Sequence, residues 1–221
     1  MIKIDTVIFD MNGVISNDEH VQEMSTEESL KEFNIDLEDN WYNKYFIGKT
    51  DHSGFKSILK AKKLNIDVNE LVKLKIKYFR KYYPLYKKDY DGVIDAIDRI
   101  SKRYKIAIAS ASNRIEMEII LTTLKVRHYF DFTVSGDDVL NGKPHPEAYL
   151  KAINLLNSKA SNSVAIEDSR NGVKAAKAAG MACIAITNTH LRENLIDVNP
   201  DIIVDKFREI DYKLIENLEI S

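Results

Sequence analysis

The chain is poor in several residue types, and each shortage excludes a class of protein. Its 221 residues include a single cysteine, Cys183. No disulfide can form within the chain, so we expect a protein of the reducing cytoplasm in which Cys183 is a small buried hydrophobe. No apolar run approaches the roughly 18 residues of a membrane span, and residues 1–5 lead straight into a strand pattern instead of a signal peptide. We therefore expect no membrane partner.

A surplus of positive charge is also missing. Lys and Arg number 32 and Asp and Glu number 34, for a formal net charge of -2. The one dense basic stretch, residues 73–88, is interleaved with tyrosines and is typical of a solvated helix face. Proteins that bind nucleic acid through their surface carry a basic patch, so we expect no nucleic-acid partner.

What the chain does contain is a regular alternation of strand and helix patterns beyond residue 88. A further buried strand is expected over residues 4–9. The apolar runs that predict the later strands cover residues 105–109, 132–134, 163–166, 182–186 and 202–204. The helical patterns between and after them cover residues 93–100, 115–124, 148–156, 173–179 and 207–218. This alternation predicts an α/β fold, a doubly wound parallel sheet with helices on both faces.

Residues 15–87 differ from the rest, because they show helical patterns and no strand-like run. Ser25 with Glu28 forms a capping box that predicts a helix start. Another helix is expected from about residue 40 to 46, and Asp51 and Asn69 are expected to cap two more. Pro84 is expected to end the last of the four.

Four helices with short links predict a small helical bundle. We therefore expect two domains, an α/β core of residues 1–14 and 88–221 and a helical domain of residues 15–87 inserted after the first strand.

Carboxylates stand at two of the predicted strand ends, which is where an open α/β sheet binds its ligands. Asp10 follows the first strand, and Glu167 and Asp168 follow the strand at residues 163–166. Carboxylates from two strand ends can hold a hard cation such as Mg²⁺ through oxygen ligands.

Other strand ends carry groups that suit a phosphoryl ligand. Ser110, Ala111 and Ser112 follow the second strand, and Asn113 after them is a good helix N-cap. Hydroxyls and backbone N–H groups at a helix start form an anion site. Lys143 lies in a loop that two prolines fix, so its ammonium group is aimed as a point charge. A cation, a lysine and a hydroxyl around one nucleophilic carboxylate predict phosphoryl transfer.

Together these segments resemble the four motifs of the haloacid dehalogenase-like superfamily, and they stand at residues 10–14, 109–112, 142–144 and 166–169. The spacing and the early helical insertion are most similar to the β-phosphoglucomutase-like phosphatase branch. The resemblance covers essentially the whole chain. It implies a Rossmann-like core with an inserted helical cap domain, and a small phosphorylated metabolite as the ligand. We expect the chain to act as a monomer.

The resemblance implies a catalytic position for Asp10, Asn12, Ser110 and Lys143. Asp10 would be the nucleophile that forms an aspartyl-phosphate. Ser110 would hydrogen-bond the transferring phosphoryl group, and Lys143 would neutralise charge on that group and on Asp10. The cofactor that it implies is Mg²⁺, held by the Asp10 carboxylate, the backbone carbonyl of Asn12 and Asp168, with Glu167 assisting.

The resemblance also implies residues that bind the substrate. Ala111 and Ser112 belong to the second motif, next to Ser110, and Asn113 follows that motif directly. His20, in the first linker to the cap domain, matches a histidine of mutase-like relatives. Gly48 and Lys49 resemble the cap loop that closes over the active site, where Lys49 would bind a distal phosphate or carboxylate.

Asn12 departs from the family pattern, which has an aspartate there as general acid and base. An amide can neither give a proton to a leaving alcohol nor take one from water, and the loss of such a group costs on the order of 10²–10⁴ in rate. Four explanations remain open. The chain is a natural variant for good leaving groups such as acyl phosphates, another group such as His20 supplies the proton, the residue is an engineered change that traps a complex, or the protein binds phosphorylated ligands without turnover.

The function that we predict is a Mg²⁺-dependent phosphatase for a small phosphorylated metabolite, with activity that is low or atypical because of Asn12. A sugar phosphomutase of the β-phosphoglucomutase type is one alternative, motivated by His20. A phosphonatase-like hydrolase of C–P bonds is another, because residues 49–52 loosely resemble the cap-lysine segment of such enzymes. A non-catalytic protein that binds phosphorylated metabolites is the third.

Overall fold

The structure, a computed structural model of the chain, describes residues 3–46 and 50–218. These residues form two compact units. One contains residues 3–17 and 88–218, and the other contains residues 18–46 and 50–87. Residues 15–17, which we expected in the helical domain, belong to the first unit, because Ser16 forms bridges with Asn12 and Asp89.

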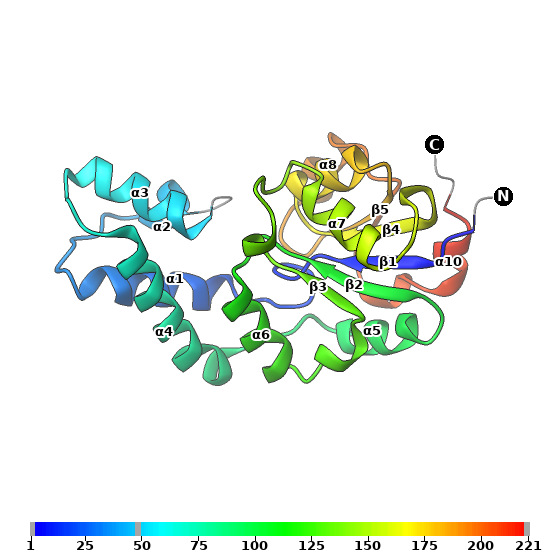
Figure 1. The fold of residues 1–221 in the computed structure, drawn as a ribbon, viewed down its shortest axis with the longest axis horizontal. Coiled ribbons are helices and arrows are strands. Elements are labelled where there is room, and N and C mark those ends of the chain that lie inside the picture. Colours follow the sequence, from blue (N-terminus) through cyan, green and yellow to red (C-terminus); the bar gives the residue numbers. More distant parts are fainter. Residues whose placement is uncertain (1–2, 47–49, 219–221) are drawn as a thin grey trace. The chain divides into compact units, whose positions relative to one another are not determined.

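The first unit is built on one parallel sheet (Figure 1). Its strands are β1 (Thr6–Phe9), β2 (Lys105–Ala109), β3 (Phe132–Val134), β4 (Ser163–Glu167), β5 (Ala182–Ile186) and β6 (Ile202–Val204). They lie in the order β3-β2-β1-β4-β5-β6, with every neighbouring pair parallel. The predicted doubly wound α/β fold is confirmed. The chain winds outward in both directions from the centre, so the switch point that binds ligands in such sheets lies beyond the ends of β1 and β4.

The helices of this unit are α5 (Val93–Ser101), α6 (Arg114–Thr123), α7 (Glu147–Leu155), α8 (Arg170–Ala178), α9 (Arg192–Ile196) and α10 (Tyr212–Glu216). The single helix expected over residues 207–218 is wrong. A 3₁₀ turn at Phe207–Glu209 is followed by a non-helical Ile210, and the Asp211 carboxylate then accepts the Leu214 N–H, 2.7 Å away, to start α10. Helix α9 was not predicted from the sequence.

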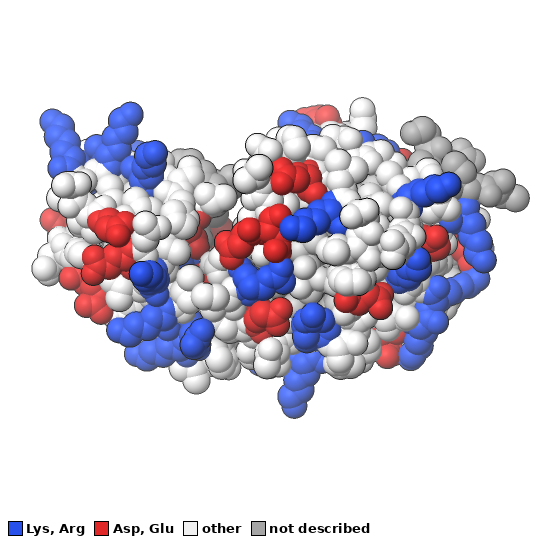
Figure 2. All heavy atoms as spheres, in the orientation of Figure 1, with Lys and Arg blue, Asp and Glu red and all other residues white. Residues whose placement is uncertain are grey.

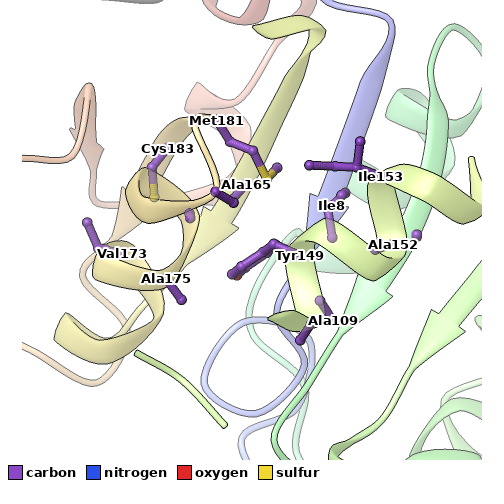
Figure 3. Packing of buried hydrophobic residues seen from close by; sticks show 14 of the residues in the cluster. Ile8, Ala109, Tyr149, Ala152, Ile153, Ala165, Val173, Ala175, Met181 and Cys183 are labelled. Atoms are coloured by element: carbon purple, nitrogen blue, oxygen red, sulfur yellow. The ribbon is translucent and has the colours of Figure 1, made fainter. Parts of the chain in front are cut away.

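One buried core cluster of the α/β unit lies between the sheet and α7 and α8 (Figure 3). Small residues dominate it, among them Ala152 of α7, Ala165 of β4 and Ala175 of α8. Small side chains let helix and sheet backbones approach closely, so the helix starts are held firmly against the strand ends. Cys183 of β5 is buried in this cluster as predicted, and burial raises the pKa of its thiol.

The second unit is helical, with α1 (Glu19–Lys31), α2 (Trp41–Tyr45), α3 (Asp51–Lys62) and α4 (Val68–Tyr86). The capping box expected at Ser25 is wrong, since Ser25 lies in the middle of α1 and its hydroxyl donates to the Val21 carbonyl, 2.6 Å away. Ser25 is buried, and such a back-bond satisfies a buried hydroxyl within a helix.

The N-caps of α3 and α4 stand one and two residues before the predicted ones, at Thr50 and Asp67. Pro84 does not end α4, which continues to Tyr86. The buried face of α4 includes a charged residue, Lys75, whose Nζ lies 2.8 Å from each oxygen of the Asp51 carboxylate.

None of the helices in the described ranges combines the length and the apolar character that a membrane crossing requires. Acidic and basic side chains are intermixed on the face of each unit that Figure 2 shows.

Candidate active site

The parallel register of β1 and β4 brings the first and fourth motifs together. Phe9 lies opposite Ile166, and the Asp10 N–H donates to the Ile166 carbonyl at 2.9 Å. Asp10 therefore leaves the sheet beside Glu167 and Asp168, at the switch point of the fold. Sequence patterning predicts each strand end, and the register shows that these ends meet.

The three carboxylates form one buried cluster. Asp10, Glu167 and Asp168 each offer an oxygen, and these oxygens all lie within 4.8 Å of one another. Exposed fractions are 8% for Asp10, 0% for Glu167 and 4% for Asp168. Oδ1 of Asp168 is buried and has no hydrogen-bond partner among the described residues. An orphaned carboxylate oxygen inside an acidic cluster is costly unless a cation binds it.

Burial and mutual repulsion change the acidity of this cluster. Burial raises the pKa of Asp10 to about 7, with Lys143 acting to lower it and Glu167 to raise it. Burial and the charges of Asp10 and Glu167 raise the pKa of Asp168 well above its usual range. The site in this form favours protons, and a bound dication would favour the ionised carboxylates instead.

Two glycines make room for the cluster. A Cβ on Gly13 would stand 1.9 Å from Oδ2 of Asp168, and Gly13 has a φ of +82° that L side chains rarely adopt. A Cβ on Gly172, in the first turn of α8, would stand 1.9 Å from the Glu167 carboxyl group. Each glycine lets a backbone turn pass directly against a carboxylate.

Lys143 reaches the cluster from the loop before α7. Its Nζ lies 2.8 Å from Oδ1 of Asp10 and 2.6 Å from Oε1 of Glu167. Burial alone would lower the pKa of Lys143, but the two carboxylates outweigh burial and raise that pKa above its usual range. The ammonium group therefore stays charged against Asp10.

Glu167 is occupied by the protein itself. Oε1 accepts hydrogen bonds from Lys143 and from the Tyr149 hydroxyl, at 2.6 Å each. Oε2 accepts from the backbone N–H groups of Asp168 and Ser169 and from the Ser169 hydroxyl, at 3.2 to 3.4 Å. Glu167 thus orients Lys143, Tyr149 and Ser169 around the cluster.

The second motif meets the first through Asn12. Oδ1 of Asn12 accepts the Ser112 hydroxyl at 2.6 Å and the Ser110 hydroxyl at 3.3 Å. Ser110 is 1% exposed, and its Oγ also accepts the Ser112 N–H at 3.1 Å. Asn113 is the N-cap of α6 as predicted, and its Oδ1 accepts the Glu116 N–H at 2.9 Å.

Ala111 lies between Ser110 and Ser112 and is exposed. Its backbone, not its side chain, is tightly packed, since a Cβ on Gly136 would stand 2.4 Å from the Ala111 carbonyl.

Three residues near the cluster were not anticipated from the sequence. Tyr149 of α7 bonds Glu167. After β5, the Thr189 hydroxyl donates to Oδ2 of Asp168, and Nδ2 of Asn188 donates to the Gly13 carbonyl at 2.8 Å. Asn188 and Thr189 follow a buried strand just as Asp10 does, so polarity after β5 was a signal that could have located them. Tyr149 lies within an apolar helix pattern, and nothing in that pattern indicates a contact with the cluster.

The predicted substrate residues of the helical segment are placed only in part. His20 lies in α1, and its Nε2 donates to the Tyr86 carbonyl at 2.9 Å, within the helical unit. Gly48 and Lys49 lie outside the described residues. The roles expected for these three residues remain predictions.

Fold and candidate site together define an α/β protein with a buried cluster of carboxylates at the carboxyl ends of its strands, where ligands bind in open α/β sheets. The chain belongs to the haloacid dehalogenase-like hydrolase family, whose sequence model matches residues 7–186.

Its relatives support the same assignment. The chain is 31% identical to the phosphorylated carbohydrates phosphatase of Thermotoga maritima, over 80% of this chain and 82% of that protein. It is 28% identical to the pyrophosphatase PpaX of Bacillus mycoides, over 95% of this chain and 96% of that protein. A solved structure assigned as a β-phosphoglucomutase, from Thermotoga maritima, is 28% identical, with a TM-score of 0.78 over 97% of this chain and 100% of that one. The predicted family and hydrolase class are confirmed.

Proposed function

We propose that this hydrolase is a Mg²⁺-dependent phosphatase that acts on a small phosphorylated metabolite through an aspartyl-phosphate on Asp10. The observation that carries the proposal is the contact of Lys143 Nζ with Asp10, 2.8 Å, inside a cluster of three buried carboxylates. Two relatives are a pyrophosphatase and a phosphatase of phosphorylated carbohydrates, which supports a phosphorylated small molecule as the substrate.

The residues present fit Mg²⁺. The cluster offers carboxylate oxygens, which hard cations prefer, and Oδ1 of Asp168 is buried with no other partner among the described residues. Asp10, the backbone carbonyl of Asn12 and Asp168 would hold the ion, with Glu167 supporting them. When bound, Mg²⁺ supplies positive charge that offsets the carboxylates and the phosphoryl oxygens.

The chemistry of the chain's own residues follows from their contacts. An oxygen of Asp10 attacks phosphorus, a bond to Asp10 forms, and the leaving group departs with the electron pair of the bond that breaks. Lys143 and the Ser110 hydroxyl donate hydrogen bonds to the transferring phosphoryl oxygens, where charge is spread in the transition state. Water then displaces Asp10 from phosphorus, and both protons of that water leave on the phosphate.

The test is to assay this chain and its Asn12→Asp variant side by side on a panel of phosphate esters with Mg²⁺. We expect phosphate release by at least one of them, and its loss in Asp10→Asn. Silence from both chains on the whole panel would overturn the proposal. A hexose phosphate isomerised instead of hydrolysed, with a bisphosphate activator, would identify a phosphomutase. A phosphonoacetaldehyde control checks the C–P hydrolase alternative.

Asn12 also favours a second candidate, a protein that binds phosphorylated metabolites with little turnover. Its side-chain oxygen is fixed by two serine hydroxyls and can neither give nor accept a proton in catalysis. Calorimetry that shows tight binding of phosphometabolite and Mg²⁺, with no turnover before or after Asn12→Asp, would establish this candidate.

A further inference from the structure

The ammonium group of Lys143 is buried and must be held in one place to act on Asp10. A lysine side chain has a flexible four-carbon stem and three donors that rotate. Two carboxylates attract this ammonium group, Asp10 at 2.8 Å and Glu167 at 2.6 Å. Attraction alone does not set the position between them, because the group gains by moving toward either one.

Tyr149 supplies a third contact from a fixed direction. Its hydroxyl accepts a hydrogen bond from Lys143 Nζ at 3.3 Å and donates to Oε1 of Glu167 at 2.6 Å. The same Nζ lies 4.8 Å from the centre of the Tyr149 ring, within reach of a cation–π interaction. Three polar atoms, one each from the lysine, the glutamate and the tyrosine, thus form a closed triangle.

The ring of Tyr149 is itself packed in the core. Tyr149 is 0% exposed and lies in the core cluster with Ile8 and Ala165, as Figure 3 shows. It belongs to α7, which begins just after the loop that carries Lys143. The Lys143 side chain therefore contacts α7, the helix that follows its loop. Because the Tyr149 ring is packed in the core, it holds the ammonium group at a defined position relative to α7.

We propose that Tyr149 is a positioning residue for Lys143: its hydroxyl fixes Glu167 and its ring seats the ammonium group against Asp10. The inference rests on the proposed function, since positioning matters for the reaction only if Lys143 acts in phosphoryl transfer. Misplacement of a reacting group by about 1 Å can cost on the order of 10² in rate. A core tyrosine that merely needs an acceptor for its hydroxyl would have no such effect.

The variant that separates these roles is Tyr149→Phe, which keeps the ring and the core volume and removes only the hydroxyl. The matched control is Tyr104→Phe. Tyr104 belongs to the same unit and is 7% exposed, and its hydroxyl is buried without a partner among the described residues. Crystal structures of the unmutated chain and of both variants, thermal unfolding, and kcat and KM on the best substrate of the ester panel are measured together.

In the Tyr149→Phe crystal structure we expect Lys143 Nζ to withdraw from Asp10 beyond hydrogen-bond distance, with the rest of the unit unchanged. We also expect kcat to fall about 10- to 100-fold at unchanged KM, while Tyr104→Phe keeps the kcat and KM of the unmutated chain. A merely structural tyrosine would lower the unfolding temperature without this split between kcat and KM.

An Nζ that stays on Asp10 in Tyr149→Phe overturns the inference, whether or not any substrate is hydrolysed. An unchanged kcat in Tyr149→Phe, alongside an inactive Lys143→Ala, overturns it while the proposed function stands. No hydrolysis by the unmutated chain and by Asn12→Asp counts against the proposed function, and the crystal structures then decide the positioning role by themselves.

Discussion

The resemblance to the four motifs implies a carboxylic acid at the position of Asn12, and the structure shows what holds the Asn12 amide. Two hydroxyls, from Ser110 and Ser112, donate to its Oδ1. The side chain is thereby oriented as a hydrogen-bonding group in the proposed phosphoryl site. What it has lost relative to the pattern is proton transfer, and that loss matters more for some substrates than for others.

The cost of Asn12 should depend on the leaving group. Acetyl phosphate releases a carboxylate, which needs no proton, whereas an alkyl phosphate ester releases an alkoxide, which does. We expect this chain to hydrolyse acetyl phosphate far faster than alkyl esters, and Asn12→Asp to raise the ester rate by about 10²–10⁴ with little change for acetyl phosphate. Asn194→Asp, at an exposed position of α9, is the control. An ester rate that Asn12→Asp leaves unchanged would contradict the expectation.

Thr189 and Thr187 allow a matched test of the cation site, because both follow β5 and both bond a carboxylate. The Thr189 hydroxyl donates to Asp168 in the cluster, and the Thr187 hydroxyl donates to Asp205, away from it, at 2.8 Å. Groups that orient a metal ligand typically contribute 10- to 100-fold in affinity. Calorimetry should therefore show Mg²⁺ binding about 10-fold weaker in Thr189→Val and unchanged in Thr187→Val. Equal affinities in the two variants would rule out this role of Thr189.

Among the elements, the start of a helix and the turn after a strand both pack closely against the carboxylate cluster. A glycine stands at each point of close approach. The α8 start passes against Glu167 through Gly172, and the turn after β1 passes against Asp168 through Gly13. Both carboxylates are buried, so neither can move aside without losing its hydrogen bonds.

Gly172→Ala should destabilise the protein, although alanine is favoured over glycine in helices by up to about 1 kcal/mol. The added Cβ would stand 1.9 Å from the Glu167 carboxyl group, and relief of such overpacking costs about 1–3 kcal/mol. Denaturant unfolding measures the change. Gly142→Ala, where a Cβ has nothing within 4 Å, should leave stability nearly unchanged. If the free energy of unfolding is the same for Gly172→Ala and Gly142→Ala, the start of α8 does not pack as closely against Glu167 as the structure shows.

At the scale of the whole molecule, the carboxylate cluster links folding to protons and to cations. In the folded protein without a cation, burial raises the pKa of Asp10 to about 7, whereas an unfolded aspartate has a pKa near 3.9. The folded state therefore binds the proton more tightly. The stability that this gives is fully present below about pH 4 and is lost as pH rises through about 7.

Mg²⁺ should reverse this trend, because it binds the ionised carboxylates. We expect the rise in unfolding temperature on adding Mg²⁺, relative to a chelator, to be larger at pH 8 than at pH 5.5. At a free concentration 100 times the Kd, the stabilisation is about 2.7 kcal/mol. Asp168→Asn should abolish the Mg²⁺-dependent shift, and Asp197→Asn, on the exposed C-terminal side of α9, should preserve it. A shift independent of pH would show that the cluster is already ionised without the cation.

Local patterning predicts the strands of a parallel sheet, the helical insertion and the polar residues at the strand ends. Apolar runs predict β1 and β4. The carboxylate that follows each run, Asp10 or Glu167, can be identified from that local segment alone. Helix ends were predicted less well, as at Pro84, since the ends depend on burial beyond the local pattern.

Which side chains meet depends on tertiary packing and could not be predicted from local patterns. The contact of Thr189 with Asp168 depends on the register between β4 and β5, and that of Tyr149 with Lys143 depends on the rotation of α7 against the sheet. Both are set by packing between segments far apart in the chain, and nothing in the pattern around Tyr149 distinguishes it from an ordinary core residue. The motifs locate the chemistry, and the packing orients the residues that would perform it.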